Sequence, residues 1–261
     1  MTNENIITPE SEGSLLVVEA LSYQYGVNPA LKNVSFGLDA GELAVLIGRN
    51  GAGKSTLLRC IAGWTQATRG NIFLKGRPID RHERWLRQHV VLIPDTPPFY
   101  EELTAWEHLQ MVSQLHRLVD WEDEAAKLLA SFGLWSNRES FPFMFSRGMR
   151  YKLALCLALL LKPTLLLLDE PLGPLDPLSA DYLWGELVRY QEQGMGILLS
   201  SHQMPQGIQP ERYLIMEQGE MALQGTPDEL MAASSIDGEI SLEALLETAV
   251  SNFISTLPSN D

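Results

Sequence analysis

Residues 42–56 read ELAVLIGRNGAGKST. The stretch begins with a short, mostly apolar run that is typical of a buried strand, and a helix is expected to follow it. In between, Gly48, four further residues and Gly53-Lys54-Ser55 match the Walker A pattern. Glycines let successive backbone N–H groups turn inward around phosphate oxygens, and the helix adds the positive end of its dipole. The stretch therefore predicts a strand, a phosphate-binding loop and a helix in succession.

The most apolar stretch of the chain, residues 153–172, reads LALCLALLLKPTLLLLDEPL. A membrane-spanning helix needs about 20 apolar residues in a row. Here Lys162 and Pro163 interrupt the run, and a proline also ends a helix. The stretch therefore predicts a buried helix that closes near Leu161, followed by a strand covered on both faces of a parallel sheet. The sequence predicts no transmembrane segment.

Asp169 and Glu170 directly follow that strand. Because burying a carboxylate without a partner is costly, the pair indicates either a core strand that emerges at the surface or a metal site. With the Walker A loop upstream, we favour the metal site. Ser55 and Asp169 would ligate Mg²⁺, and Lys54 would neutralise the β- and γ-phosphates. Glu170 is then expected to orient or deprotonate the attacking water.

The rest of the chain alternates between strands and helices, except for an aromatic-rich, mostly helical lobe at 96–144. In this lobe Thr104 and Glu107 have the spacing of a capping box. Asp176 and Pro177 suit the N-cap and the first position of a later helix. The expected strands are 15–23, 30–38, 42–48, 70–76, 89–94, 164–169 and 196–201, the expected helices are 53–63, 149–161 and 177–193, and a hairpin covers 212–225.

The same pattern divides the chain into three regions. Residues 1–14 are expected to form a flexible acidic tail. Residues 15–225 are expected to form the main domain, with a helical subdomain inserted at about 96–161. Residues 226–261 are expected to form an acidic C-terminal extension with a helix around 241–254.

The composition limits the partners of the chain. The formal net charge is -14, and both tails contain acidic residues and no basic residue. An acidic chain is a poor general partner for nucleic acid or for anionic lipid headgroups. Cys60 and Cys156, the only cysteines, lie in expected helices, and two buried thiols fit a reducing compartment. The N-terminal segment has no apolar core, so no signal peptide is expected.

Further motifs follow one another along the chain, namely Tyr25, FSRGM at 145–149, PLGPLDP at 171–177 and LLSSH at 198–202. Together with the Walker A loop and the acidic pair, they make residues 15–225 closely resemble the nucleotide-binding subunit of ABC transporters. The resemblance implies an α/β fold: a P-loop NTPase core with a mostly parallel sheet, an N-terminal antiparallel β-subdomain and an inserted α-helical subdomain. It also implies an ATPase whose cofactors are ATP and Mg²⁺.

The resemblance assigns roles to individual residues. Tyr25 is expected to stack on adenine, and His202 to contact the γ-phosphate. FSRGM stands where the family has LSGGQ. There Ser146 and Gly148, at the start of a helix from about Met149, would form an anion site that faces ATP held by a second subunit. The remaining nucleotide-binding positions are Asn50, Gly51, Ala52, Gly53, Lys54, Ser55 and Thr56 in the loop, and Asp176 in the D-loop.

Four positions depart from the family pattern. Arg147 and Met149 replace the glycine and the glutamine of the signature, and Asp95 replaces the Q-loop glutamine. All three resemble exporter-type members. Asp95 is expected to be a catalytic residue and a Mg²⁺ ligand, because a carboxylate ligates Mg²⁺ at least as well as an amide does. It could equally be a turn residue before two prolines. Pro174 replaces a glycine and should stiffen the D-loop.

By the same resemblance, the chain is the ATP-hydrolysing subunit of a transporter, with export as the expected direction. It would form a homodimer closed by ATP at the cytoplasmic face of the membrane. A separately encoded transmembrane permease would dock on the helical lobe, and no nucleic-acid partner is expected.

Two alternatives stay open at this point. The first is a soluble ABC-type ATPase that acts on the ribosome or on nucleic acid. Such proteins usually join two cassettes or insert long coiled coils, whereas this acidic chain has one cassette and no heptad run. The second is a nucleotide-binding regulator with little hydrolysis. It is disfavoured because Lys54, Asp169, Glu170 and His202 are all present.

Overall fold

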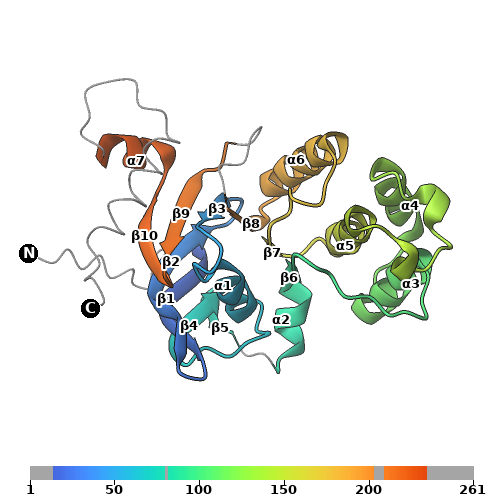
Figure 1. The fold of residues 1–261 in the computed structure, drawn as a ribbon. Coiled ribbons are helices and arrows are strands. Elements are labelled where there is room, and N and C mark those ends of the chain that lie inside the picture. The colour runs from blue at the N-terminus through green and yellow to red at the C-terminus, as the bar shows by residue number, and fades with distance from the viewer. Residues whose placement is uncertain (1–13, 80–81, 203–208, 234–261) are drawn as a thin grey trace, which may run out of the picture.

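The computed structural model describes residues 14–79, 82–202 and 209–233. The expectations for the tail before residue 14 and for a helix around 241–254 lie outside the described residues. Figure 1 shows two groups of elements, with most strands on one side and α3, α4 and α5 clustered on the other. In the described ranges no helix is long and apolar enough to cross a membrane.

The strands form two sheets. A four-stranded antiparallel sheet has the order β2-β1-β4-β5, and a six-stranded sheet has the order β10-β9-β3-β8-β7-β6. In the larger sheet β6, β7, β8, β3 and β9 are parallel, and only β10 is antiparallel. The strands are β1 (Ser14–Tyr25), β2 (Asn28–Asp39), β3 (Leu43–Ile47), β4 (Arg69–Leu74), β5 (Arg77–Pro78), β6 (Val90–Ile93), β7 (Leu165–Leu168), β8 (Gly196–Ser201), β9 (Arg212–Glu217) and β10 (Glu220–Gly225).

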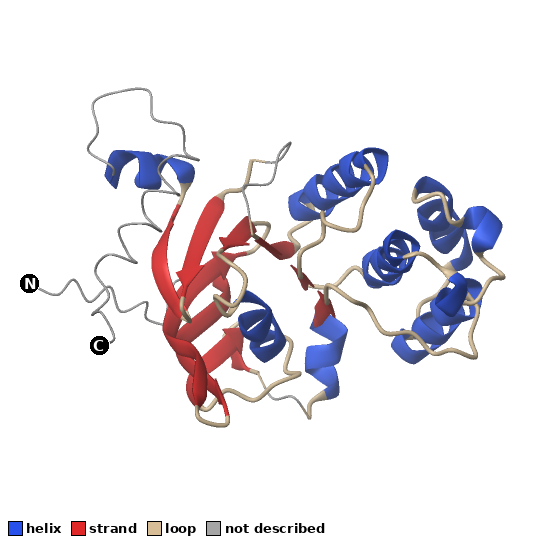
Figure 2. Cartoon of the chain, viewed as in Figure 1, coloured by secondary structure: helices blue, strands red, loops and turns tan. Residues whose placement is uncertain are grey.

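The helices lie around the larger sheet and in the separate cluster (Figure 2). In the cluster, α5 packs against both α3 and α4, and α5 also contacts β6 of the larger sheet. The helices are α1 (Lys54–Ile61), α2 (Arg84–His89), α3 (Ala105–His116), α4 (Glu122–Ser131), α5 (Arg147–Leu161), α6 (Pro177–Glu192) and α7 (Pro227–Ala233), with short 3-10 turns at Trp135–Asn137 and Pro142–Met144.

Burial on both faces of the central strands explains their unbroken apolar sequence. Every residue of β3, β7 and β8 is buried. Alternate residues point to opposite faces of a strand. Leu46, Leu167 and Leu198 accordingly join a core with α1 and the antiparallel sheet. Val45 and Leu166 face the other way, into a core with α5, α6 and the helical cluster.

The predicted fold class is confirmed, as are most of its local signals. Thr104 and Glu107 form a complete capping box at α3. Asp176 caps α6, whose first residue is Pro177, and β9 and β10 form the expected hairpin. Both cysteines are buried free thiols, and burial raises the pKa of Cys60 to about 12.

One predicted boundary needs correction, and one short helix was missed. The helix expected from Met149 begins at Arg147, because the Ser146 hydroxyl accepts a hydrogen bond from the backbone N–H of Met149 and so caps the helix earlier. The short helix α2 was not predicted. It has six residues, with Leu86 as its one buried side chain, so it leaves almost no apolar periodicity in the sequence.

Candidate functional site

The candidate site lies where the parallel strands end. The carboxyl ends of such strands meet at one edge of a sheet, and ligands of open α/β sheets bind there. After β3 comes the glycine-rich loop, after β6 Asp95, after β7 Asp169 and Glu170, and after β8 His202. The sheet order places these strands side by side, so residues far apart in sequence reach one place.

The loop between β3 and α1 requires glycine at specific positions. A Cβ on Gly48 would lie 2.4 Å from the carbonyl oxygen of Met216. Gly53 has a φ of 105°, and a Cβ there would lie 2.6 Å from the carbonyl oxygen of Ala30. The first turn of α1 has neither an acidic residue nor a side-chain cap. Its backbone N–H groups and dipole are therefore directed at the loop, as anion binding requires.

Lys54 is buried beneath this loop. Its Nζ donates to the carbonyl oxygen of Gly48 at 2.6 Å and lies 3.2 Å from Oε1 of Glu170. A buried ammonium group needs such partners, because its desolvation is otherwise costly. The contact with Glu170 also means that Lys54 must exchange a carboxylate for a phosphate when it binds a nucleotide.

Asp169 is held by two hydroxyl groups. Its Oδ1 accepts hydrogen bonds from Oγ of Ser55 at 3.1 Å and from Oγ of Ser200 at 2.7 Å. Its backbone N–H donates to the carbonyl oxygen of Ile93. Ser200 was missed as a site residue, although it precedes His202 by two positions at the end of a buried strand. Ser200 therefore fixes the carboxylate that was predicted to ligate a metal.

These oxygens fit Mg²⁺ bound together with a nucleotide. Mg²⁺ prefers oxygen ligands and usually binds through one or two carboxylates plus substrate phosphates, keeping several waters. Ser55 and Asp169 supply one hydroxyl and one carboxylate in direct contact. In the described part of the chain, no group of three or more acidic, histidine or cysteine side chains could hold a metal by itself. The chemistry of the donor set thus fits a metal that arrives with phosphates.

Glu170 connects several parts of the site. Its Oε2 accepts a hydrogen bond from Nδ1 of His202 at 2.8 Å, and its backbone N–H donates to Oγ of Ser200 at 3.0 Å. Its φ is 51°, a left-handed conformation that is uncommon for a residue other than glycine. Such strain clusters at functional sites, where surrounding contacts enforce it. The Ser200 contact anchors Glu170 between Lys54 and His202.

Asp95 has a partner that the sequence did not reveal. Its Oδ1 lies 2.5 Å from Nη2 of Arg147, the arginine of the signature. Two of the departures from the family pattern therefore form one ion pair between the β6 loop and the first residue of α5. Asp95 also lines the pocket above the glycine-rich loop. Its role as a metal ligand stays a prediction.

The pocket above the loop has a volume of about 440 Å³. The hydroxyl of the half-exposed Tyr25 at its rim lies 3.4 Å from Oγ1 of Thr56. Other residues from the predicted set that line this pocket are Asn50, Gly51, Ala52, Gly53, Lys54, Ser55, Asp95 and Glu170.

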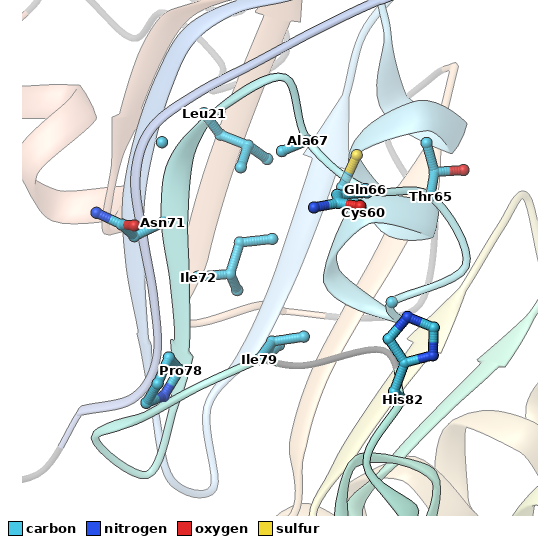
Figure 3. A pocket seen from close by; sticks show the side chains of 12 residues that line it. Leu21, Cys60, Thr65, Gln66, Ala67, Asn71, Ile72, Pro78, Ile79 and His82 are labelled. Atoms are coloured by element: carbon cyan, nitrogen blue, oxygen red, sulfur yellow. The ribbon is translucent and has the colours of Figure 1, made fainter.

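A second hollow, of about 450 Å³, lies near Cys60 of α1 and Ile72 of β4 (Figure 3). No lysine or arginine is among its described lining residues, and His82 is the single titratable nitrogen base there. A triphosphate needs fixed positive charge. The pocket that contains Lys54 is therefore the candidate phosphate site.

The signature and the D-loop lie outside that pocket. Ser146, Gly148 and Asp176 are absent from its lining, and Gly148 lies against the D-loop of the same chain. A Cβ on Gly148 would lie 2.7 Å from the carbonyl oxygen of Pro174. Asp176 accepts hydrogen bonds from Lys152 and from the N–H of Ser179, which hold the pKa of its carboxyl well below the ordinary range. Asp169 and His202 are also absent from this lining, but hydrogen bonds join them to the lining residues Ser55 and Glu170.

Comparisons with known proteins agree with this geometry. A family model described as "ABC transporter" matches residues 31–173. The ABC-type transporter ATP-binding protein EcsA of Bacillus subtilis is 37% identical over 83% of this chain and 89% of its own length. The linearmycin resistance ATP-binding protein LnrL of the same organism is 32% identical over 87% of this chain and 74% of its own. The aliphatic sulfonates import ATP-binding protein SsuB of Escherichia coli is 32% identical over 84% and 83%.

Solved structures give the same result. The ATP binding subunit of an ABC transporter is similar with a TM-score of 0.82 and 35% identity, over 90% of this chain and 99% of that one. The dimeric structure of a bacterial ABC transporter cassette shares the fold, with a TM-score of 0.73 and 22% identity, over 81% and 98%.

Proposed function

This chain belongs to the family of ABC transporter ATP-binding proteins, which hydrolyse ATP, and we propose that it powers export through a separately encoded membrane permease. The observation that carries the proposal is the convergence of Lys54, Asp169, Glu170 and His202 at the ends of adjacent parallel strands. Asp95 and Arg147 resemble exporter-type members, which supports export as the direction. The relatives bear names of import as well as of resistance proteins.

The contacts suggest how the site hydrolyses ATP. Tyr25 stacks on adenine at the rim, the loop from Asn50 to Thr56 surrounds the phosphates, and Lys54 moves from Glu170 to the β- and γ-phosphates. Ser55, Asp169 and Asp95 would hold Mg²⁺, which would supply positive charge to offset the negative charge that develops on the phosphates.

Glu170 then accepts the proton of the attacking water. Departure of Lys54 frees Oε1 of the Glu170 carboxylate to accept this proton. His202 keeps the carboxylate oriented through the hydrogen bond from Nδ1. With both ring nitrogens protonated, Nδ1–H donates to Glu170 and Nε2–H can donate to the γ-phosphate.

We infer that two copies of the chain close around ATP. Ser146, Gly148 and Asp176 are placed outside the phosphate pocket of their own chain, so they are available to complete the pocket of a second copy. The N-terminus of α5, capped by Ser146, adds a helix dipole to that contact. ATP then joins the two chains, and hydrolysis releases them.

The dimer can be tested with Glu170→Gln, which should bind ATP without hydrolysing it. Light scattering should show a shift from monomer to dimer when ATP and Mg²⁺ are added to this variant. Lys54→Ala, which loses the phosphate contact, should stay monomeric under the same conditions. A Glu170→Gln chain that stays monomeric in saturating ATP would contradict the two-chain site.

An apolar hollow on the chain supports the proposal that it binds a membrane permease. It has a volume of about 230 Å³ between the β6 loop and α5, and Trp64, Pro98, Phe99 and Leu157 are among its lining residues. Trp64 is more than half exposed there. We propose that a helix of the permease packs into this hollow, which would hold the chain at the cytoplasmic face of the membrane. No observation favours the alternative partners, the ribosome and nucleic acid.

A further inference from the structure

Tyr151 in α5 has a buried hydroxyl group without a hydrogen-bond partner. The side chain is 0% exposed, and its oxygen is one of three buried side-chain polar atoms in the described residues that lack a partner. Tyrosine hydroxyls that are buried usually find one. Tyr190 illustrates the rule, because its hydroxyl donates to the carbonyl oxygen of Leu159 at 3.3 Å. The Tyr151 hydroxyl therefore calls for a functional explanation.

The geometry of α5 places Tyr151 beside the ATP site. Tyr151 follows Arg147 by four residues, so the two share one face of the helix. Long helical side chains lean toward the N-terminus, so the Tyr151 ring leans toward the turn of α5 that contains Arg147, the partner of Asp95. The negative charges of the site act on the hydroxyl as well. Burial first, and then Asp169, Asp95 and Glu170, raise the pKa of Tyr151 well above its ordinary value. The hydroxyl therefore remains a proton donor.

Among these three carboxylates, Asp95 is the best acceptor for this donor. Asp169 is buried and held on Oδ1 by two serines, at a position from which it does not accept a hydrogen bond from Tyr151. Glu170 contacts Lys54 on one oxygen and His202 on the other. Asp95 has one partner within the described residues, the guanidinium of Arg147 on Oδ1. The Arg147 side chain is 59% exposed, so its guanidinium can leave Asp95 at little cost.

We propose that Tyr151 is a positioning residue of the ATPase. When the ion pair between Arg147 and Asp95 breaks, the Tyr151 hydroxyl donates a hydrogen bond to the Asp95 carboxylate and orients it toward the Mg²⁺ site. The inference rests on the proposed function, because it uses the role of Asp95 in the ATP site. It connects the signature helix to the metal site within one chain. When Arg147 moves away, Asp95 changes its partner from Arg147 to Tyr151, which lies one turn further along α5.

Tyr151→Phe tests this role because it removes the hydroxyl and keeps the ring. The variant should unfold in urea at the same midpoint as the wild type or at a higher one, since it loses a buried polar atom that had no partner. The Mg²⁺ concentration for half-maximal ATPase activity should rise roughly tenfold, the effect expected for losing a hydrogen bond to a charged group. Tyr190→Phe is the matched control. It should lower the urea midpoint and leave the Mg²⁺ dependence unchanged.

The double variant Asp95→Gln/Tyr151→Phe shows whether Tyr151 acts through Asp95. In the Asp95→Gln background, the loss of the hydroxyl should change the Mg²⁺ dependence by less than about twofold. An unchanged Mg²⁺ dependence in the single variant would overturn the inference, and so would a full tenfold shift that persists without Asp95. Failure of the proposed function would give a separate result, namely equal ATPase activity in the wild type and in the Lys54→Ala variant.

Discussion

Glu170→Gln should make the chain bind ADP more tightly in the absence of Mg²⁺. In the structure Lys54 lies 3.2 Å from Oε1 of Glu170, and Lys54 must leave this carboxylate to reach a phosphate. Glutamine keeps the shape and an acceptor oxygen but removes the negative charge. The variant therefore releases Lys54 more readily, and it also removes a charge that repels the phosphates. Both effects favour the nucleotide.

The magnitude follows from the burial of the pair. Two charges about 4 Å apart attract by about 4 kcal/mol when the effective dielectric constant is near 20. Lys54 is 6% exposed and Glu170 is 24% exposed, so solvent screens the pair only in part. The glutamine amide keeps a portion of the hydrogen bond, and a hydrogen bond to a charged group is worth about 1.5–3 kcal/mol in total. A gain of about 1–2 kcal/mol remains, which corresponds to roughly 5- to 30-fold tighter binding.

Calorimetric titration with ADP in the presence of a chelator measures this effect without hydrolysis or metal. Glu220→Gln is the matched control, because Glu220 also pairs with a lysine, Lys32, at 3.3 Å, but both side chains are about two-fifths exposed. Its ADP affinity should equal that of the wild type. Equal or weaker ADP binding by Glu170→Gln would refute the idea that Glu170 competes with phosphate for Lys54.

Three further predictions concern other parts of the site. Gly148→Ala would place a Cβ 2.7 Å from the carbonyl oxygen of Pro174, so it should lower the free energy of unfolding by about 1–3 kcal/mol. Gly185→Ala in α6 meets no atom within 4 Å and should raise it by up to about 1 kcal/mol; urea titration checks both, and equal effects would contradict the close approach. Tyr25→Ala should raise the apparent KM for ATP with little change in kcat, and an equal loss of inorganic triphosphate hydrolysis would argue against adenine stacking. Asp95→Gln should keep ATPase activity with a shifted Mg²⁺ dependence, and complete inactivation would show that the carboxylate itself is required.

Local sequence patterns predicted much of the fold. The glycine spacing of the Walker A loop, the all-apolar strands and the caps at Thr104 and Asp176 each depend on neighbours a few residues away, and all of them are confirmed. The start of α5 was placed too late, because Gly148 weakens the helical pattern while the capping preference of Ser146 decides the boundary.

Contacts between distant residues could not be predicted in this way. Ser200 holds Asp169 and Glu170 across 30 or more positions of sequence, and Arg147 meets Asp95 across 52 positions. The local periodicity of the sequence does not predict such pairs, because it is the sheet order and the packing of α5 that bring them together. The buried Tyr151 hydroxyl is of the same kind, since its sequence position indicates an apolar helix face and its charged surroundings come from two other loops, those after β6 and β7.

The central claim is that the chain powers a membrane permease, and a pull-down from gently solubilised membranes tests it most directly. The wild-type chain should co-elute with one integral membrane protein in stoichiometric amount. Trp64→Ser, in the apolar hollow, should lose this partner, while Trp135→Ser, a similarly exposed tryptophan outside that hollow, should keep it. Co-elution with ribosomal or DNA-bound proteins instead, or with no integral membrane protein, would contradict the account.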